Sequence, residues 1–362
     1  VDVIANSDLN INNTDTAGIS GSFIGVTVNS ATAVAKNTVK AGIRGADIHA
    51  ETGTVTVKAE ADNDAAATSV GGAVGAYAVG AMKAETRLGT TADEEGVADS
   101  GNNTTIYSDG LILKSISNDD IFADGEALSG GLIGLAGADV DTETRQDAIA
   151  QIGNDVEIHT GTLEIEANHY QSVDARGDAL AFGLGAGFGV DVDNLILGQS
   201  VVDIGQNSEL FASDIFIDAK NVVSKERFNT GFNLSSGSVG LVSFGIMSST
   251  TDIGKGSESF DARVDIASGT LLQVDSPEGE ETPVIGAESR NAPRIEIEAY
   301  VNAKGVDNVK IEAVSGLVGG AKGKSIMNAE LNSQVNITDA TIINTDGDVF
   351  LTTRTAPLLP PN

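Results

Sequence analysis

The three histidines are the side chains of this chain whose type best suits metal binding or proton transfer near neutral pH. His49 and His159 have similar surroundings, each between an apolar strand residue and a small residue that leads into a turn. This places both on an outward face, about a hundred residues apart in sequence and too far apart to share one metal ion. We therefore predict that all three, His169 included, are solvated outward side chains.

Arg176, Gly177 and Asp178 match the tripeptide that integrin-binding proteins use. The surrounding pattern predicts a turn between strands, where a loop would present the three residues to a receptor. Because Gly and Asp are abundant in this chain, a structural turn that matches by chance is the alternative. We nominate these three as candidate binding residues, and we predict no catalytic and no metal-binding residues.

Acidic clusters at predicted turns offer the oxygen ligands that Ca²⁺ prefers. They are Asp62-Asn63-Asp64, Asp93-Glu94-Glu95, Asp139-Val140-Asp141 and Asp346-Gly347-Asp348. The chain lacks both the glycine-and-aspartate nonapeptide of calcium-binding β-rolls and the EF-hand loop. We therefore expect solvated acidic turns and no cofactor, with bound Ca²⁺ as the alternative.

Other catalytic chemistries find little support in the sequence. The Gly-rich segment 183–189 lacks the spacing of a nucleotide-binding loop and is followed by no helix pattern. The absence of Cys excludes thiol nucleophiles and zinc–thiolate sites. With no Trp and four Tyr, the chain offers few aromatic platforms for sugar rings. We expect that the protein is not an enzyme, and a polysaccharide-acting β-helix enzyme is the alternative.

Short strands of alternating apolar residues, usually closing on Ala, recur along the chain. The clearest copies are residues 55–59, 163–167, 215–219 and 295–299, and weaker copies are residues 9–11, 111–113 and 349–351. A Gly-rich run of small residues lies between these strands, near Gly25, Gly75, Gly134, Gly185, Gly240 and Gly319. Both series step by about 52 residues and share one long step, which indicates an internal repeat.

The repeat favours a solenoid. Residues 149–167 contain three short apolar strands separated by Gly, Asn or Asp, which is the length of one β-helix coil of about 22 residues. The Gly-rich half of each repeat would form a second coil. We therefore predict an all-β fold, a right-handed parallel β-helix with about two coils per ~52-residue repeat, and a rod about 70–80 Å long. A string of small antiparallel β-sandwiches is the alternative, although such domains usually need about 100 residues.

One β-helical repeat domain is expected over residues 1–355. Residues 275–293 lengthen one repeat and hold three of the six prolines, so we expect a loop insertion there. Residues 356–362 are expected to form a Pro-rich tail or linker. The chain starts in mid-pattern, without the basic start and apolar segment of a signal peptide, and we expect it to be a soluble piece of a longer protein.

Acidic residues dominate the charged set. There are 52 Asp and Glu against 21 Lys and Arg, and the formal net charge is −31. Such a surface repels phosphate backbones and anionic lipid, so we expect no nucleic-acid partner and no membrane insertion of this segment. High acidity is compatible with a salty exterior, where counterions screen the charges. We expect an extracellular location or the bacterial cell surface.

The alternation of Gly-rich runs with Val/Ile-x-Val/Ile-x-Ala strands resembles the repeat region of large secreted bacterial adhesins. The similar families are the filamentous-haemagglutinin and leukotoxin-like filamentous adhesins and the autotransporter passengers. The resemblance runs from about residue 8 to residue 353 and rests on pattern, not on an invariant motif. It implies a right-handed β-helix, secretion through the outer membrane and a role in attachment or display.

The expected function is therefore a non-catalytic adhesin or surface-display stalk of a bacterium. Its expected partners are a host or neighbouring cell surface, or other copies of the same chain. A structural subunit of a surface filament or layer is the alternative.

Overall fold

The computed structural model describes residues 1–89, 95–225, 234–256, 260–274, 293–305, 309–345 and 347–356. These residues form strands and turns, and the strand pairs are parallel. The described ranges contain no helix long and apolar enough to cross a bilayer. The all-β prediction is confirmed.

The strands are β1 (Asp2–Gly21), β2 (Ile24–Ala35), β3 (Val39–Gly42), β4 (Asp47–Val74), β5 (Tyr77–Leu88), β6 (Glu95–Asp99), β7 (Thr105–Gly130), β8 (Ile133–Ile152), β9 (Glu157–Phe182), β10 (Gly185–Ile204), β11 (Glu209–Ala212), β12 (Asp214–Lys225), β13 (Leu234–Ile253), β14 (Phe260–Ile266), β15 (Leu271–Val274), β16 (Arg294–Gly305), β17 (Val309–Ala329), β18 (Leu331–Ile337), β19 (Ile342–Thr345) and β20 (Asp348–Ala356).

Each repeat makes one full turn of the chain. Leu163 pairs with Leu111 of the preceding repeat and with Ile215 of the next, so residues 52 positions apart lie side by side. The prediction of two coils per repeat is therefore wrong. Of the two strand breaks predicted in residues 149–167, Gly153-Asn154-Asp155 does separate β8 from β9, whereas Thr160-Gly161-Thr162 lies inside the 26-residue β9.

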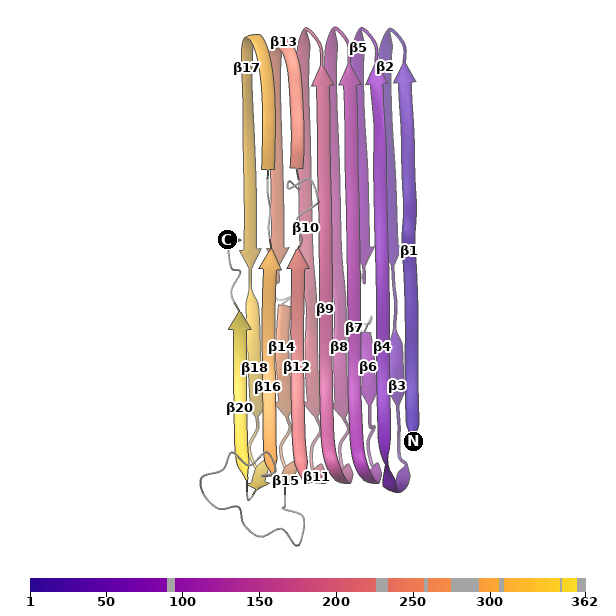
Figure 1. The fold of residues 1–362 in the computed structure, drawn as a ribbon, viewed down its shortest axis with the longest axis vertical. Helices are drawn as coiled ribbons and strands as arrows, with labels where there is room; N and C mark the ends of the chain where they lie inside the picture. Colours follow the sequence, from indigo (N-terminus) through magenta and orange to yellow (C-terminus); the bar gives the residue numbers. More distant parts are fainter. Residues whose placement is uncertain are drawn as a thin grey trace.

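Two layers of strands run in opposite directions (Figure 1). In one layer β1, β4, β7, β9, β12, β16 and β20 rise side by side, and the chain then turns at one end and descends in the other layer through strands such as β5, β8 and β10. The long axis of the molecule follows the strands. The predicted length of about 70–80 Å along the stack is also wrong, because it assumed two coils per repeat. With one turn per repeat, turns of about 4.8 Å each add up to only about 30 Å across the stack.

Alternation along each strand sends every second side chain inward. Away from the turns that join the rising to the descending layer, the core is rich in Val, Ile and Leu, including Val57, Leu113 and Ile165, with Ala among them. Near those turns it is rich in Ala, with Met82 and Phe188 among the few large side chains.

The four clearest predicted strands are confirmed, as are the copies at 111–113 and 349–351. All six pair in register with one another on successive turns of the rising layer. The first copy was misplaced, because Val3 pairs with Val57 and residues 1–5, not 9–11, are its equivalent. The predicted insertion falls almost wholly on residues 275–292, which lie outside the described residues, as do residues 357–362 of the predicted tail. The strands on either side of the insertion keep register, since Val274 pairs with Ala212 and Arg294 pairs with Asp214.

Candidate functional site

The turns that join the rising to the descending layer gather at one end of the molecule (Figure 1). In each repeat the segment around this turn carries no Asp, Glu, Lys or Arg. We call the six segments together the apolar tip; they are residues 16–35, 65–82, 127–138, 179–190, 234–251 and 313–321. A chain with net charge −31 thus has one end without charge.

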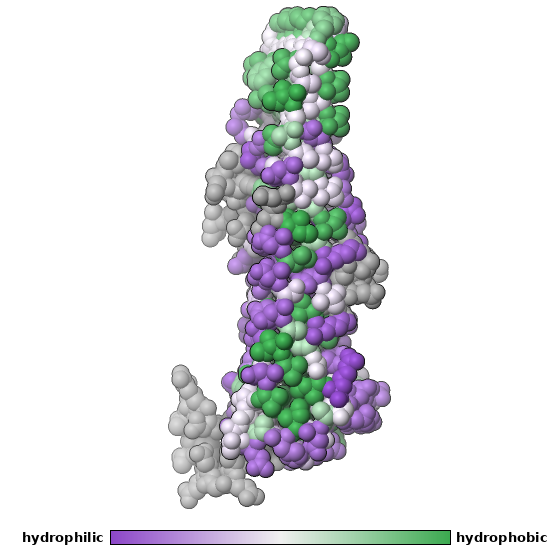
Figure 2. Space-filling model, turned by 90° about the vertical axis from the view of Figure 1, so that its right-hand side faces the viewer, coloured by the Kyte–Doolittle hydropathy of each residue, from purple (hydrophilic) through white to green (hydrophobic). Residues whose placement is uncertain are grey.

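Large apolar side chains project from the turns themselves. Phe23, Leu132, Leu184, Leu241 and Leu317 occupy equivalent turn positions in five of the six segments, and their exposed fractions are 74%, 55%, 55%, 45% and 76%. The second segment has Ala76 there. Figure 2 shows hydrophobic colour covering this end, whereas the body below it is a mixture of hydrophilic residues and smaller hydrophobic areas. Single exposed Leu residues are common on protein surfaces, but continuous apolar patches are not, and such patches are typical of contact surfaces.

The apolar surface also covers both outer faces next to the turns. Exposed apolar side chains of the rising layer include Val74, Phe182, Val239 and Val314, and those of the descending layer include Val26, Val79, Leu135 and Phe244. The tip is therefore a ridge that is apolar on its edge and on both sides.

Polar atoms within the tip are largely satisfied internally. Backbone N–H groups of the turns donate to carbonyls of neighbouring repeats, as Gly75 N does to Gly130 O at 3.0 Å and Gly131 N to Phe182 O at 3.0 Å. The Ser129 hydroxyl donates to Ala78 O at 2.9 Å, and the Thr27 hydroxyl donates to Gly72 O at 2.6 Å. Removing this end from water therefore forfeits few hydrogen bonds.

A groove of about 700 Å³ crosses the outer face of the rising layer at the base of the tip. Leu128 and Leu180 line its apolar side, and Glu126, Arg176 and Asp178 line its charged side. The groove marks the border at which the apolar tip gives way to the charged body.

The predicted tripeptide lies at this border, inside strand β9 and not at a turn, so its predicted placement is wrong. Arg176 Nε donates to Asp178 Oδ2 at 2.9 Å, and Arg176 Nη2 lies 3.3 Å from Glu126 Oε1. Gly177 faces inward, where a Cβ would come within 2.5 Å of Val190 Cγ1. Recognition by a receptor stays a prediction, and it would require Arg176 to leave these carboxylates.

Two of the three histidines follow the prediction. His49 and His159 are outward, and both stack on Tyr107 between them, with ring centroids 4.9 and 4.8 Å apart. Phe211 extends the stack beyond His159 at 4.6 Å. This column lies at the end of the molecule opposite the tip, where the short strand β11 pairs with β9.

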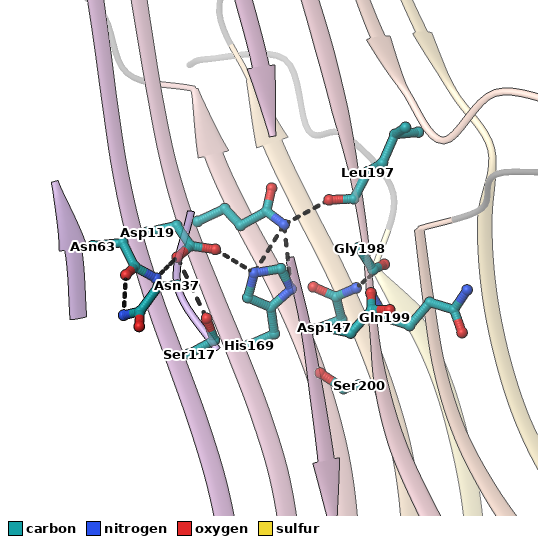
Figure 3. Close-up of polar contacts among 12 residues, drawn as sticks. Asn37, Asn63, Ser117, Asp119, Asp147, His169, Leu197, Gly198, Gln199 and Ser200 are labelled. Carbon is teal, nitrogen blue, oxygen red and sulfur yellow. Dashed lines mark hydrogen bonds and ion pairs between the residues drawn. The ribbon is translucent and has the colours of Figure 1, made fainter. Parts of the chain in front are cut away.

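The prediction for His169 is wrong, because its side chain is fully buried. His169 Nε2 lies 2.7 Å from Asp119 Oδ2 (Figure 3). Gln171 Nε2 lies 3.2 Å from His169 Nδ1. Asp119 also accepts from Asn63 Nδ2 at 2.8 Å. Alternation could have revealed this, because His169 shares the parity of the inward residues Ile165 and Ala167.

Asn63, Asp119, His169 and Gln171 form a polar belt that crosses the core below the tip. In later repeats the equivalent positions are apolar, since Val223 pairs with Gln171 and Val301 pairs with Asn221. The belt contains a His–Asp pair, but the Ser117 hydroxyl donates to Asp119 at 3.3 Å and not to His169 (Figure 3). The arrangement does not assemble a nucleophile with a base.

Two of the four acidic clusters do not sit at turns, whereas Gly347 of the fourth lies in the bend between β19 and β20. Asp62 and Asp64 lie within β4 on either side of the buried Asn63, and Asp139 and Asp141 lie within β8 beside Lys83. Residues 93, 94 and 346 of the other two clusters lie outside the described residues. Over the described ranges, no group of three or more His, Asp or Glu side chains is placed to hold a metal ion.

Sequence reasoning noticed the tip only as Gly-rich runs. The missed signal is charge, since windows free of Asp, Glu, Lys and Arg recur in phase with these runs. Comparison with protein-family models, with curated proteins and with solved structures gave no match.

Proposed function

We propose that this chain is a right-handed parallel β-helix that serves as a non-catalytic, extracellular adhesin or surface-display stalk of a bacterium, with the apolar tip as its contact surface. The handedness is supported by Figure 1, where the strands nearest the viewer rise while the chain advances from the N-terminus on the right toward the left. Parallel crossovers prefer this hand.

The observation that carries the proposal is the contrast between tip and body. The body bears acidic columns that keep it in water, as at Asp139 and Asp191, which pair in register. The tip exposes Leu and Val side chains at positions that a monomer in water would fill with polar residues. This contrast favours a protein that stays dissolved along most of its length and makes contact at one end.

A second line of support is the rigidity that the strands provide. The described rising strands between β1 and β20 are hydrogen-bonded to neighbours on both sides, as β9 is to β7 and β12. Long continuous ladders of this kind hold the tip at a fixed distance from the opposite end, which suits a display role.

The test compares microspheres coated with the protein for their retention on a layer of cultured cells under flow. Leu132→Asp places a charge at the tip, and Gln206→Asp places the same charge on an exposed turn at the opposite end. We expect Leu132→Asp to lose most of the retention and Gln206→Asp to keep it. Equal retention of both variants would contradict the proposed contact surface.

A structural subunit of a filament or layer is the second candidate, and the edges of the stack favour it. Within the described residues, β1 pairs only with β4 and β20 only with β16, so one edge of each is unpaired. Such edges are templates for further strands. Concentration-dependent filaments in electron micrographs that persist in Leu132→Asp would favour this candidate over the adhesin.

A further inference from the structure

We infer that the apolar tip inserts into the interface of a lipid bilayer, with the turn leucines at the boundary of the acyl chains. This inference rests on the proposed function and names the chemistry of the tip's partner. It reverses the expectation of no membrane insertion, which considered only electrostatic attraction and spanning helices.

The shape of the tip favours a fluid partner over a folded one. Six turns about 4.8 Å apart, on two layers about 10 Å apart, give an end face of roughly 250 Å². A stable protein–protein contact buries about 800 Å² on each partner. A second copy meeting the tip end-on would therefore cover the turns but leave the apolar side chains on both outer faces, such as Phe182 and Phe244, in water. Lipid surrounds a ridge on all sides.

The depth of the charge-free zone fits the bilayer interface. Leu132 at the turn is six residues from Glu126 and seven from Asp139, which is about 20 Å along each strand. Interfacial insertion reaches about 5–10 Å into the boundary between headgroups and acyl chains. At that depth the acidic residues that flank the tip, Glu126 and Asp139, remain on the aqueous side.

Hydrogen bonding removes the usual penalty for placing irregular backbone in an apolar medium. Turn N–H groups donate between repeats, as Gly183 N does to Val239 O at 3.0 Å and Gly185 N to Leu132 O at 2.9 Å. Unpaired edges are confined to the outermost strands of the described stack, and at interfacial depth their polar groups stay within reach of water.

Charge sets the kind of lipid. The charged residues nearest the tip are mainly acidic, among them Glu126, Asp139, Asp178 and Asp191. They repel anionic headgroups, so the tip should prefer zwitterionic phosphatidylcholine to mixtures containing phosphatidylserine. Raising the salt concentration should leave binding to phosphatidylcholine nearly unchanged, because apolar contact supplies the attraction.

The experiment uses Trp fluorescence, since the chain contains no Trp. Leu184→Trp reports on the tip, and Phe211→Trp reports on the opposite end. With phosphatidylcholine vesicles, we expect the Leu184→Trp emission to shift to the blue and to be quenched by bromine-labelled acyl chains, while Phe211→Trp does not respond. Adding Leu132→Asp to the tip reporter should lower the vesicle partition coefficient by at least about tenfold, and adding Gln206→Asp should not.

No response of Leu184→Trp, an equal response of Phe211→Trp, or stronger binding to phosphatidylserine vesicles would overturn the inference. A dimer in analytical ultracentrifugation that Leu132→Asp dissociates would also overturn it, by assigning the tip to a second copy. If vesicle binding fails while Leu132→Asp still abolishes bead retention on cells, lipid is the wrong partner but the proposed contact surface stands. If retention is unaffected too, both are wrong.

Discussion

At the scale of single residues, the buried Asp119 carboxylate organises the polar belt. It lies 2.7 Å from His169 Nε2 and accepts from Asn63 Nδ2 at 2.8 Å. Gln171 Nε2 lies 3.2 Å from Nδ1 and 3.0 Å from Nε2 of the same ring. One acidic group therefore fixes the orientation of three neighbouring side chains.

We predict that Asp119→Ala lowers the free energy of unfolding by about 3–5 kcal/mol, since it strands buried donors without an acceptor. Urea unfolding followed by circular dichroism measures the change. The double variant Asp119→Ala, His169→Ala should lose less free energy of unfolding than the sum of the losses in the two single variants, because each side chain is the other's hydrogen-bond partner. A loss below about 1 kcal/mol for Asp119→Ala would show that water replaces the carboxylate.

Gly177 is required for packing. We predict that Gly177→Ala costs about 1–3 kcal/mol, because its Cβ would approach Val190 Cγ1 to 2.5 Å and Val192 Cγ2 to 3.0 Å. Gly189→Ala is the matched control, since a Cβ there meets nothing within 4 Å. Thermal unfolding should therefore separate the two variants, with Gly189→Ala neutral or slightly stabilised. Similar melting temperatures would refute the packing role.

Sequence alone could have placed some of these residues. Period-two alternation assigns His169 to the face of Ile165 and Ala167, and it assigns Arg176 to the outward face of the same strand. What the sequence could not supply is the partner from the next repeat. Glu126, which lies near Arg176, is 50 positions earlier in the chain, and its proximity depends on the length of one turn.

At the scale of elements, the repeat spacing was predictable and the coil count was not. Two markers stepping by about 52 residues identified the strands that pair. Gly, Asn and Asp were then interpreted as turns, as their local preferences suggest. Inside the stack, however, residues such as Asn63 and Gly125 occupy inward strand positions, because ladder bonds to two neighbours outweigh local preference.

The insertion offers an element-scale prediction. In the preceding turn, Ser213 alone connects Ala212 to Asp214, whereas residues 275–293 separate the equivalent positions Val274 and Arg294. Since the flanking strands are already in register, replacing residues 275–293 with a single Ser should leave the melting temperature nearly unchanged. Differential scanning calorimetry checks this. A fall of more than about 3 kcal/mol in stability would mean that the segment contributes to the core.

At the scale of the whole molecule, buried carboxylates make stability depend on pH. Burial raises the pKa of Asp124 to about 7 and that of Asp218 to about 6. Burial is also the main cause that raises the pKa values of Asp147, Asp193 and Asp203. In the unfolded chain such groups titrate near pH 3.9. Between about pH 4 and pH 7 the unfolded chain therefore releases protons that the folded chain retains, so the free energy of unfolding falls as pH rises.

We accordingly predict a higher melting temperature at pH 5 than at pH 8. Screening by salt should reduce the part that arises from repulsion among the 52 acidic residues. The variant Asp124→Asn, Asp218→Asn should show a smaller difference between the two pH values. A melting temperature that rises from pH 5 to pH 8 would contradict this origin.

The central claim is that each repeat is one complete turn, because only then do the charge-free segments of all repeats meet at one end. The chain has no Cys, so engineered disulfides test it cleanly. Ser172 and Ser224 pair in register on adjacent turns, within the range of about 4.4–6.8 Å between Cα atoms that a disulfide spans. We predict that Ser172→Cys, Ser224→Cys forms an intramolecular disulfide under mild oxidation, and that Ser172→Cys, Gln199→Cys does not. Efficient disulfide formation by the second pair and none by the first would show that each repeat contains two coils, and the charge-free segments would then not meet at one end.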